Sequence, residues 1–341
     1  MQKEFHTGPF IVAEMSGNHN QSLERALAIV DAAADCGVTA LKLQTYTADT
    51  MTMRDVYTIN DPKSLWYGQD LYKLYQEAHT PWEWHKALFD KAKERGIICF
   101  STPFDETAVD FLESLNNPIY KIASFEVNHI PLLKYIANTG KPVIMSTGAS
   151  TLAEIEEAVN TLRENGCTDL TLLKCTSVYP ATPENTNLLT IPHLKQLFDC
   201  KAGLSDHTLG IGVAIASVAL GASVIEKHFC LCRADGGVDS AFSMEPQEMK
   251  MLVEEVNRAC LALGKVSYGL LEVEKNSRIF KRSIYASKKI EAGEVFTKDN
   301  IWVKRPGTGK IRAEEYFKIL GKRAVVDIAS GLHLTWNMIR D

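Results

Sequence analysis

Several patterns that mark whole classes of protein are missing from this sequence of 341 residues. No apolar run approaches the ~20 residues that span a bilayer, and the N-terminal stretch MQKEFHTGPF lacks the apolar centre of a signal peptide. The formal net charge of -5 argues against a general nucleic-acid binder, which would be basic. We therefore expect a cytoplasmic protein that has neither a membrane nor a nucleic acid as its partner.

The eight cysteines form no recognisable framework, because none lies in a C-x-x-C pair. Cys99 and Cys175 fall within apolar runs, and no secretion signal points to an oxidising compartment, so we expect reduced and mostly buried thiols. The sequence also has no H-E-x-x-H zinc motif. No G-x-G-x-x-G follows its first apolar run, which disfavours a dinucleotide-binding fold.

Short apolar runs alternate with helical patterns from the N-terminus to about residue 265. Eight of these runs are predicted strands, at residues 10–15, 39–46, 97–104, 119–126, 142–148, 170–180, 200–207 and 222–229. Apolar strands separated by helices are typical of a parallel sheet that is buried on both faces. We therefore expect an α/β protein with a closed (β/α)8 barrel, which needs roughly 250 residues. An open doubly wound sheet is the alternative.

The composition changes after about Leu263, where a polar and weakly periodic stretch begins. Beyond it, short β-type runs are separated by glycine-containing turns. We expect a barrel over residues 1–263, a linker over 264–282 and a small β-rich domain over 283–341. A long insertion at about residues 48–80 follows the second predicted strand, and its aromatic residues could shape a pocket.

Polar side chains gather near the C-terminal ends of the predicted strands, the edge at which barrel enzymes carry their active sites. Taken singly, such a serine or threonine is more often a helix N-cap, and a lone histidine is more often a core residue. Lys42 and Lys121 are harder to explain in that way, because a buried ammonium group needs an anionic partner. Two lysines with several hydroxyls on one face predict a site for a phosphate or a carboxylate.

The stretch GLSDHTLG, at residues 203–210, lies where a predicted strand gives way to a helix. Its His207 and the His228 of the next predicted strand would reach the same rim of a barrel. Two imidazoles with water and a nearby carboxylate suit Mn²⁺, Fe²⁺ or Zn²⁺ better than Ca²⁺. We expect Asp206 to orient His207 rather than to bind the metal itself.

These stretches together resemble the sialic acid synthase family, and the likeness covers essentially the whole chain. It is carried by AEMSGNHNQSL, LKLQTYT, FSTPF, YKIASFE, MSTG, KCTSVYP, GLSDHT and EKHF, while VKRPGTG is similar to the family's antifreeze-like domain. The segment 65–85 and the KIASFE stretch most resemble the branch of the family that makes pseudaminic acid. Branches that make N-acetylneuraminic acid or legionaminic acid are the alternatives.

The resemblance implies a (β/α)8 TIM barrel followed by a small β-rich antifreeze-like (SAF) domain. It implies condensation of phosphoenolpyruvate with an N-acetylated amino sugar in its open aldehyde form, giving a nine-carbon 2-keto sugar acid and phosphate. A divalent metal would bind His207 and His228, with Mn²⁺ favoured and Mg²⁺ or Co²⁺ as alternatives. Phosphoenolpyruvate contacts are implied for Lys42, Thr102, Lys121, Ser124, Ser146, Ser177 and Ser205.

The same resemblance implies sugar contacts and a dimer. Sugar contacts are implied for Glu14, Glu126, Tyr179 and Asp239, and Lys121 would join Glu14, Glu126 and Asp239 in catalysis. We favour Glu14 over Glu126 as the carboxylate that guides the attacking water. In the implied homodimer the antifreeze-like domain caps the other subunit's barrel, where Arg305 would reach the sugar's acetamido group.

Two further interpretations of the sequence need to be weighed. Other barrel enzymes that condense phosphoenolpyruvate make seven- or eight-carbon keto sugar phosphates, but they lack the C-terminal module that VKRPGTG marks. A non-catalytic sugar- or ice-binding protein would be expected to carry a degenerate site. Here both histidines, both lysines and the carboxylates are all present.

Overall fold

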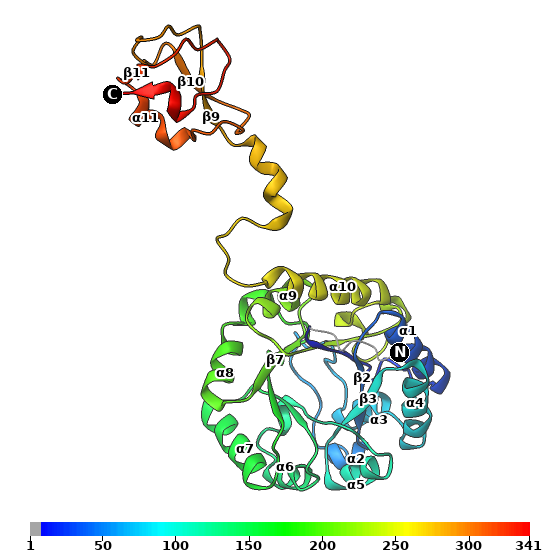
Figure 1. The fold of residues 1–341 in the computed structure, drawn as a ribbon. Coiled ribbons are helices and arrows are strands. Elements are labelled where there is room, and N and C mark those ends of the chain that lie inside the picture. Colours follow the sequence, from blue (N-terminus) through cyan, green and yellow to red (C-terminus); the bar gives the residue numbers. More distant parts are fainter. Residues whose placement is uncertain (1–7) are drawn as a thin grey trace. The chain divides into compact units, whose positions relative to one another are not determined.

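The computed structural model describes residues 8–341, which form two compact units divided between Gly264 and Lys265. The first unit is a closed barrel of eight parallel strands in sequence order, in which β8 pairs with β1 (Figure 1). The strands are β1 (Phe10–Glu14), β2 (Ala40–Thr45), β3 (Ile98–Pro103), β4 (Tyr120–Ile122), β5 (Val143–Ser146), β6 (Leu170–Cys175), β7 (Lys201–Asp206) and β8 (Val224–His228). The predicted barrel is confirmed, and the open sheet is excluded.

Most of the helices surround the barrel on its outer side (Figure 1), whereas α2 (Ala48–Met51) and α3 (Leu71–Ala78) belong to the insertion after β2 and contribute residues to a cavity. The others are α1 (Leu23–Asp35), α4 (Trp82–Arg95), α5 (Glu106–Ser114), α6 (Ile130–Ala137), α7 (Leu152–Glu164), α8 (Thr190–Phe198), α9 (Gly212–Ala219) and α10 (Pro246–Leu263). Their ends follow local side-chain chemistry. The Ser22 hydroxyl accepts from the Arg25 amide at the start of α1, and Gly96 ends α4 in the left-handed conformation. Within residues 8–341, no helix is both long and apolar enough to cross a membrane.

The strands are buried on both faces, and the two faces differ. Outward residues such as Leu41 and Leu43 pack with the helices in the main hydrophobic core. The inward residues nearest the N-terminal ends of the strands form a second, smaller apolar cluster, made up of Val12, Ala40, Phe100, Ile144, Leu173 and Val224. Because strand side chains alternate with a period of two, the next inward positions are Glu14, Lys42, Thr102, Ser146, Cys175 and Glu226. The barrel interior therefore changes from apolar to polar within one layer.

The second unit has a small core of its own, which includes Ile284, Phe296, Ile301 and Leu334. Two antiparallel pairs make its sheets: β9 (Ser283–Ala286) with β10 (Ile301–Lys304), and β11 (Arg323–Ala324) with β12 (Ile339–Arg340). Its one α-helix among the described residues is α11 (Tyr316–Ile319). The segment expected to be a linker contains a 3-10 helix, Glu272–Phe280, with exposed residues throughout.

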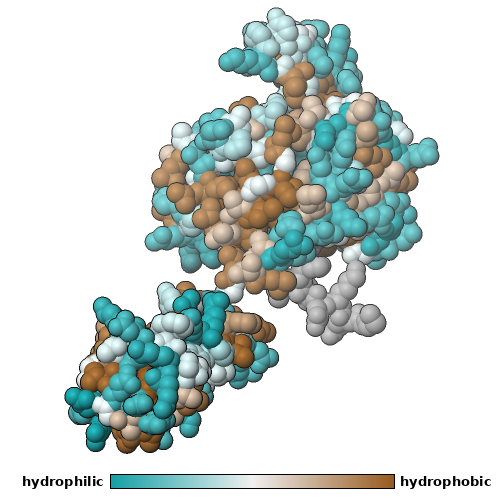
Figure 2. Space-filling view, turned by 90° about the horizontal axis from the view of Figure 1, so that it is seen from above, coloured by the Kyte–Doolittle hydropathy of each residue, from teal (hydrophilic) through white to brown (hydrophobic). Residues whose placement is uncertain are grey.

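The surface shown in Figure 2 is mixed in hydropathy, and the cysteines form no disulfides among the described residues. On the face of the barrel unit shown in Figure 2, hydrophobic side chains gather near the middle and hydrophilic ones flank them, which is ordinary for a globular protein. All eight cysteines lie in the described part of the chain and are free, and five of them are buried. The prediction of reduced thiols is confirmed for the structure.

Gly203 in β7 allows a close approach to β8 and gives the first prediction. A Cβ atom at this position would lie 2.3 Å from the Val224 carbonyl oxygen and 2.9 Å from Leu173. We expect Gly203→Ala to lower the free energy of unfolding by about 1–3 kcal/mol in urea titrations, because the backbone must shift. Gly212→Ala is the matched control, because a Cβ there would meet no described atom within 4 Å. Equal stability of the two variants would contradict the prediction.

Candidate active site

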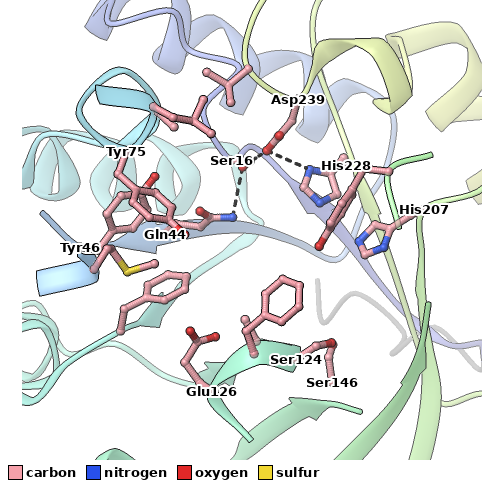
Figure 3. Close-up of a pocket in the computed structure, with 18 of the residues that line it drawn as sticks. Ser16, Gln44, Tyr46, Tyr75, Ser124, Glu126, Ser146, His207, His228 and Asp239 are labelled. Carbon is pink, nitrogen blue, oxygen red and sulfur yellow. Dashed lines mark hydrogen bonds and ion pairs between the residues drawn. The ribbon is translucent and has the colours of Figure 1, made fainter. Parts of the chain in front are cut away.

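A cavity of about 430 Å³ opens at the C-terminal ends of the barrel strands, and Figure 3 shows its lining. Ten of the fourteen site residues expected from the sequence line it: Lys42, Lys121, Ser124, Glu126, Ser146, Tyr179, Ser205, His207, His228 and Asp239. Glu14 and Thr102 lie behind this lining, where both contact the Lys42 amine. Ser177 lies beside Gly148, and Arg305 belongs to the second unit. The barrel thus brings together side chains from all parts of its sequence.

The two histidines lie next to each other at the ends of β7 and β8, with ring centroids 5.3 Å apart (Figure 3). The Nδ1 atom of His207 is 2.9 Å from the Thr176 carbonyl oxygen, which can only accept, so Nδ1 carries a proton, and in the neutral ring Nε2 keeps its lone pair. Burial opposes the charged ring, but Cys175 and the Thr176 carbonyl raise the pKa of His207 above its usual value. His228 Nδ1 is buried without a hydrogen bond among the described residues, 3.7 Å from the Asp239 carboxylate. Burial lowers the pKa of His228 well below its usual value, which keeps the ring neutral.

Asp206 does not orient His207, contrary to our expectation. Its carboxylate pairs with Lys227 Nζ at 2.8 Å and accepts hydrogen bonds from the amide and hydroxyl of Thr208. The reason is strand alternation, which turns Ser205 and His207 into the barrel and Asp206 away from it. The backbone carbonyl of Thr176 takes the orienting role instead.

The buried lysines find their anionic partners within the protein. Lys42 Nζ lies 3.0 Å from Glu14 and 3.5 Å from Glu226, and Lys121 Nζ lies 3.8 Å from the other oxygen of Glu226. Burial alone would lower the pKa of Lys42, but the two glutamates raise it above its usual value. Burial lowers the pKa of Lys121, whose nearest side-chain partner is the Ser146 hydroxyl at 2.7 Å.

Glu226 was not among the predicted site residues, although it closes a strand as the others do. It bridges both lysines and also accepts a hydrogen bond of 3.0 Å from Ser205. The signal that could have identified it is a carboxylate at the end of an apolar run, directly before Lys227 and His228. Because Glu226 lies inside the lysine and hydroxyl cluster, it adjusts the charge that the cluster offers to a ligand.

Hydroxyl groups surround the two lysines. Ser124 accepts a hydrogen bond from the Gly148 amide at 3.1 Å, and a Cβ atom at Gly148 would lie 2.2 Å from the Ser177 hydroxyl oxygen. Only glycine therefore fits between these two serines. Ammonium and hydroxyl groups gathered in this way are the donors that phosphates and carboxylates bind.

Two carboxylates reach the cavity from opposite sides of the view in Figure 3. Asp239 accepts from the Ser16 hydroxyl, which in turn accepts from Gln44 at 3.1 Å. Glu126 has an oxygen, Oε2, with no hydrogen-bond partner among the described residues. Burial raises the pKa of Glu126 to about 7, so this carboxyl can hold or release a proton near neutral pH.

The insertion at residues 48–80 forms the remaining wall of the cavity. It contributes Met51, Ile59, Ser64, Trp66, Leu71, Leu74, Tyr75 and Ala78. The expectation that this segment shapes a pocket is confirmed for Trp66 and Tyr75. Tyr72 instead bonds to Asp49 and Arg54, and Tyr67 is exposed.

The fold and site define a barrel enzyme with a charged, hydroxyl-rich cavity for an anionic substrate beside a two-histidine site. The chain belongs to the NeuB family, whose family model matches residues 29–268, and an SAF domain model matches residues 281–340. It is a nonulosonic acid synthase, an enzyme of the transferase class.

The similar proteins agree with this family. The chain is 43% identical to a pseudaminic acid synthase of Campylobacter jejuni, over 94% of each chain. It is 40% identical to an N,N'-diacetyllegionaminic acid synthase of the same species, over 92% of this chain and 95% of the relative. A crystal structure of N-acetylneuraminic acid synthetase from Leptospira borgpetersenii in complex with citrate superposes with a TM-score of 0.72 at 31% identity, covering 80% of this chain and 90% of that one.

The raised pKa of Glu126 gives a prediction about stability and pH. A carboxyl with a folded-state pKa of about 7 binds more protons in the folded than in the unfolded chain between about pH 4.5 and 7, so stability falls as the pH rises through that window. We expect Glu126→Gln to be more stable than the ligand-free wild type by about 3 kcal/mol at pH 8, and equally stable below about pH 4.5.

Urea unfolding at the two pH values measures this difference. Glu157→Gln, on an exposed face of α7, is the control for the substitution itself. A stability difference between Glu126→Gln and the wild type that stays constant with pH would contradict the assigned protonation.

Proposed function

We propose that this protein condenses phosphoenolpyruvate with 2,4-diacetamido-2,4,6-trideoxy-L-altrose to pseudaminic acid and phosphate. The observation that carries the proposal is the 43% identity to pseudaminic acid synthases over nearly the full length, together with a complete polar cavity. Legionaminic acid and N-acetylneuraminic acid synthesis are the alternatives, since relatives with those names are also similar. A non-catalytic sugar-binding protein would not need two buried lysines and two neighbouring histidines in one cavity.

Phosphoenolpyruvate fits the cluster of lysines and hydroxyls. Lys42, Lys121 and the nearby serines would bind its phosphate and carboxylate and offset their charge. C3 of phosphoenolpyruvate forms a bond to the aldehyde carbon of the sugar, whose oxygen takes up a proton. Water adds to C2 and loses a proton, and the tetrahedral carbon then expels phosphate together with the bridging oxygen. One water is consumed and one phosphate is released for each product.

The histidines fit a divalent metal ion. In the neutral form of His207 the Nε2 lone pair is available to a metal, and the neutral His228 has a buried nitrogen without a partner among residues 8–341. No group of three or more His, Cys, Asp or Glu side chains in that range is arranged for a metal. The fit is therefore to two protein ligands, with positions left for water and substrate. We propose Mn²⁺, with Mg²⁺ or Co²⁺ as alternatives; when bound, such an ion polarises a carbonyl oxygen.

The two candidate carboxylates for proton transfer differ in their surroundings. Glu14 is held by Lys42 at 3.0 Å and by Gln44 at 2.9 Å, and it lies behind the cavity lining. Glu126 lines the cavity, and its pKa of about 7 suits it to exchange protons. We therefore propose that Glu126 transfers the proton and that Glu14 positions Lys42 through their ion pair. This differs from the expectation, drawn from the sequence, that Glu14 guides the attacking water.

We propose further that the protein is a cytoplasmic homodimer with the parts 1–263, 264–282 and 283–341. Support comes from the segment between the units, where Val266, Tyr268 and Val273 are each more than four-fifths exposed. Monomeric proteins rarely leave such apolar side chains together in water. In this arrangement Arg305 of the SAF domain would complete the partner's cavity and bind the acetamido group of the sugar. An active monomer in sedimentation measurements would overturn this part.

Steady-state assays with three sugars test the reaction. With phosphoenolpyruvate and Mn²⁺, we expect one phosphate for each molecule of 2,4-diacetamido-2,4,6-trideoxy-L-altrose consumed, and much slower release with its legionaminic acid counterpart or with N-acetylmannosamine. Activity with N-acetylmannosamine alone would overturn the choice of substrate. Bridge-oxygen labelling should place the label in the phosphate, because the proposed cleavage breaks the C–O bond.

Calorimetry tests the metal site without the reaction. We expect His207→Ala and His228→Ala each to weaken Mn²⁺ binding by more than about 100-fold, since even second-sphere changes cost about 10–100-fold. His193→Ala is the control, because this histidine of α8 is exposed. Unchanged Mn²⁺ affinity in both variants would contradict the assignment.

A further inference from the structure

The two ends of the cavity differ in chemistry. Figure 3 shows His207, His228, Ser124 and Ser146 toward one end and Tyr46 and Tyr75 at the other. Lys121 belongs to the first end, because its amine donates to Ser146 at 2.7 Å. Tyr46 and Tyr75 pack edge to face, with ring centroids 5.7 Å apart. The insertion at residues 48–80 supplies aliphatic side chains to the cavity: Leu71 lies one helical turn before Tyr75 in α3, Leu74 directly precedes Tyr75, and Ile59 comes from the segment that pairs with the start of α3. A ligand that fills this cavity is therefore polar at one end and apolar at the other.

The apolar end is a built wall rather than a loose loop. The backbone of Ile59 exchanges hydrogen bonds with Gln69 and Gly68 at 2.9 and 2.8 Å, and the Leu71 amide donates to Tyr57 at 3.0 Å. The Trp66 indole donates to the Val238 carbonyl at 2.9 Å, which ties the insertion to the loop that carries Asp239. Since its backbone is held at both ends, the insertion presents the same side chains to every ligand.

The direction of the sugar follows from the reaction. Its aldehyde carbon, C1, must meet phosphoenolpyruvate at the end of the cavity with the lysines and histidines. C6 is the carbon farthest from C1 in the open chain, so it points to the wall formed by the insertion. In the proposed substrate C6 is a methyl group, whereas most six-carbon sugars carry a hydroxyl there. A hydroxyl against aliphatic side chains would lose its hydrogen bonds with water and gain none.

We propose that the insertion forms a subsite for the C6 methyl group of a 6-deoxy sugar, and that Ile59 and Leu71 are specificity-determining residues of this enzyme. The inference rests on the proposed function and extends it from the reaction to the choice of sugar. The aliphatic wall selects the deoxy sugar by excluding the hydroxyl, which makes it a selection against the wrong substrate as well as a contact with the right one.

Two polar substitutions of similar size test the subsite. Leu71→Asn and Ile59→Thr place a hydrogen-bonding group in the wall, and both residues are only partly buried, so the fold should tolerate them. Leu65→Asn is the matched control, since Leu65 lies in the same insertion but is 46% exposed. The measured quantity is the ratio of kcat/KM for the 6-deoxy sugar to that for its 6-hydroxy counterpart, with KM for phosphoenolpyruvate and the melting temperature recorded for each variant.

We expect the wild type to prefer the 6-deoxy sugar by about 10–200-fold, and each wall variant to lower this ratio by about ten-fold. KM for phosphoenolpyruvate should stay unchanged, because the lysine cluster is untouched, and Leu65→Asn should behave as the wild type. If one wall variant does not fold, the ratio in the other decides. An unchanged ratio in an active, folded wall variant overturns the subsite. No phosphate release by the wild type with any acetamido sugar overturns the proposed function instead.

Discussion

The active site depends on a group of four charges buried inside the barrel. Lys42, Lys121, Glu14 and Glu226 lie in the layer directly above the apolar floor of the barrel, and all four are almost completely buried. None of them could be buried alone, because an unpaired ion in the interior costs several kcal/mol. Their mutual contacts make two cationic groups available at the base of a cavity without exposing them to water. An arriving anion then finds donors that are already desolvated and held in position.

The same strand geometry that places these charges also places the histidines. In a parallel barrel each strand contributes every second side chain to the interior, and neighbouring strands are in fixed register. Glu14 pairs in register with Lys42 on one side and with His228 on the other. The lysine cluster and the two-histidine site are therefore adjacent, because β1 lies between the strands that carry Lys42 and His228. A substrate that binds the first has its reacting carbon beside the second, which is the arrangement a condensation between an anion and an aldehyde requires.

In the proposed subsite, the side chains that select the sugar come from the insertion, whereas those proposed to bind phosphoenolpyruvate and the metal come from the strand ends. The strand ends supply the ionic and hydroxyl groups of the cavity. The insertion between β2 and α4 supplies most of the aliphatic wall, and it is a loop with two short helices. Loops of this kind can change without disturbing the barrel, because the core does not depend on them.

The sequence by itself determined the eight strands, the polar residues at their ends and the family, because periodicity and motifs are local properties of a chain. It also pointed to His207, His228, Lys42 and Lys121, whose residue types are rare at the ends of apolar strands. Only the tertiary structure decided which strand-end side chains face inward. Asp206 and Lys227 turn out to face away from the cavity as an ion pair, while Glu226 joins the lysines. The distinction between Glu14 and Glu126 also needed the structure, because a carboxyl group's pKa depends on neighbours that are distant in sequence. Alternation along a strand is visible in a sequence, but the face that closes around the barrel axis is set by packing among all eight strands.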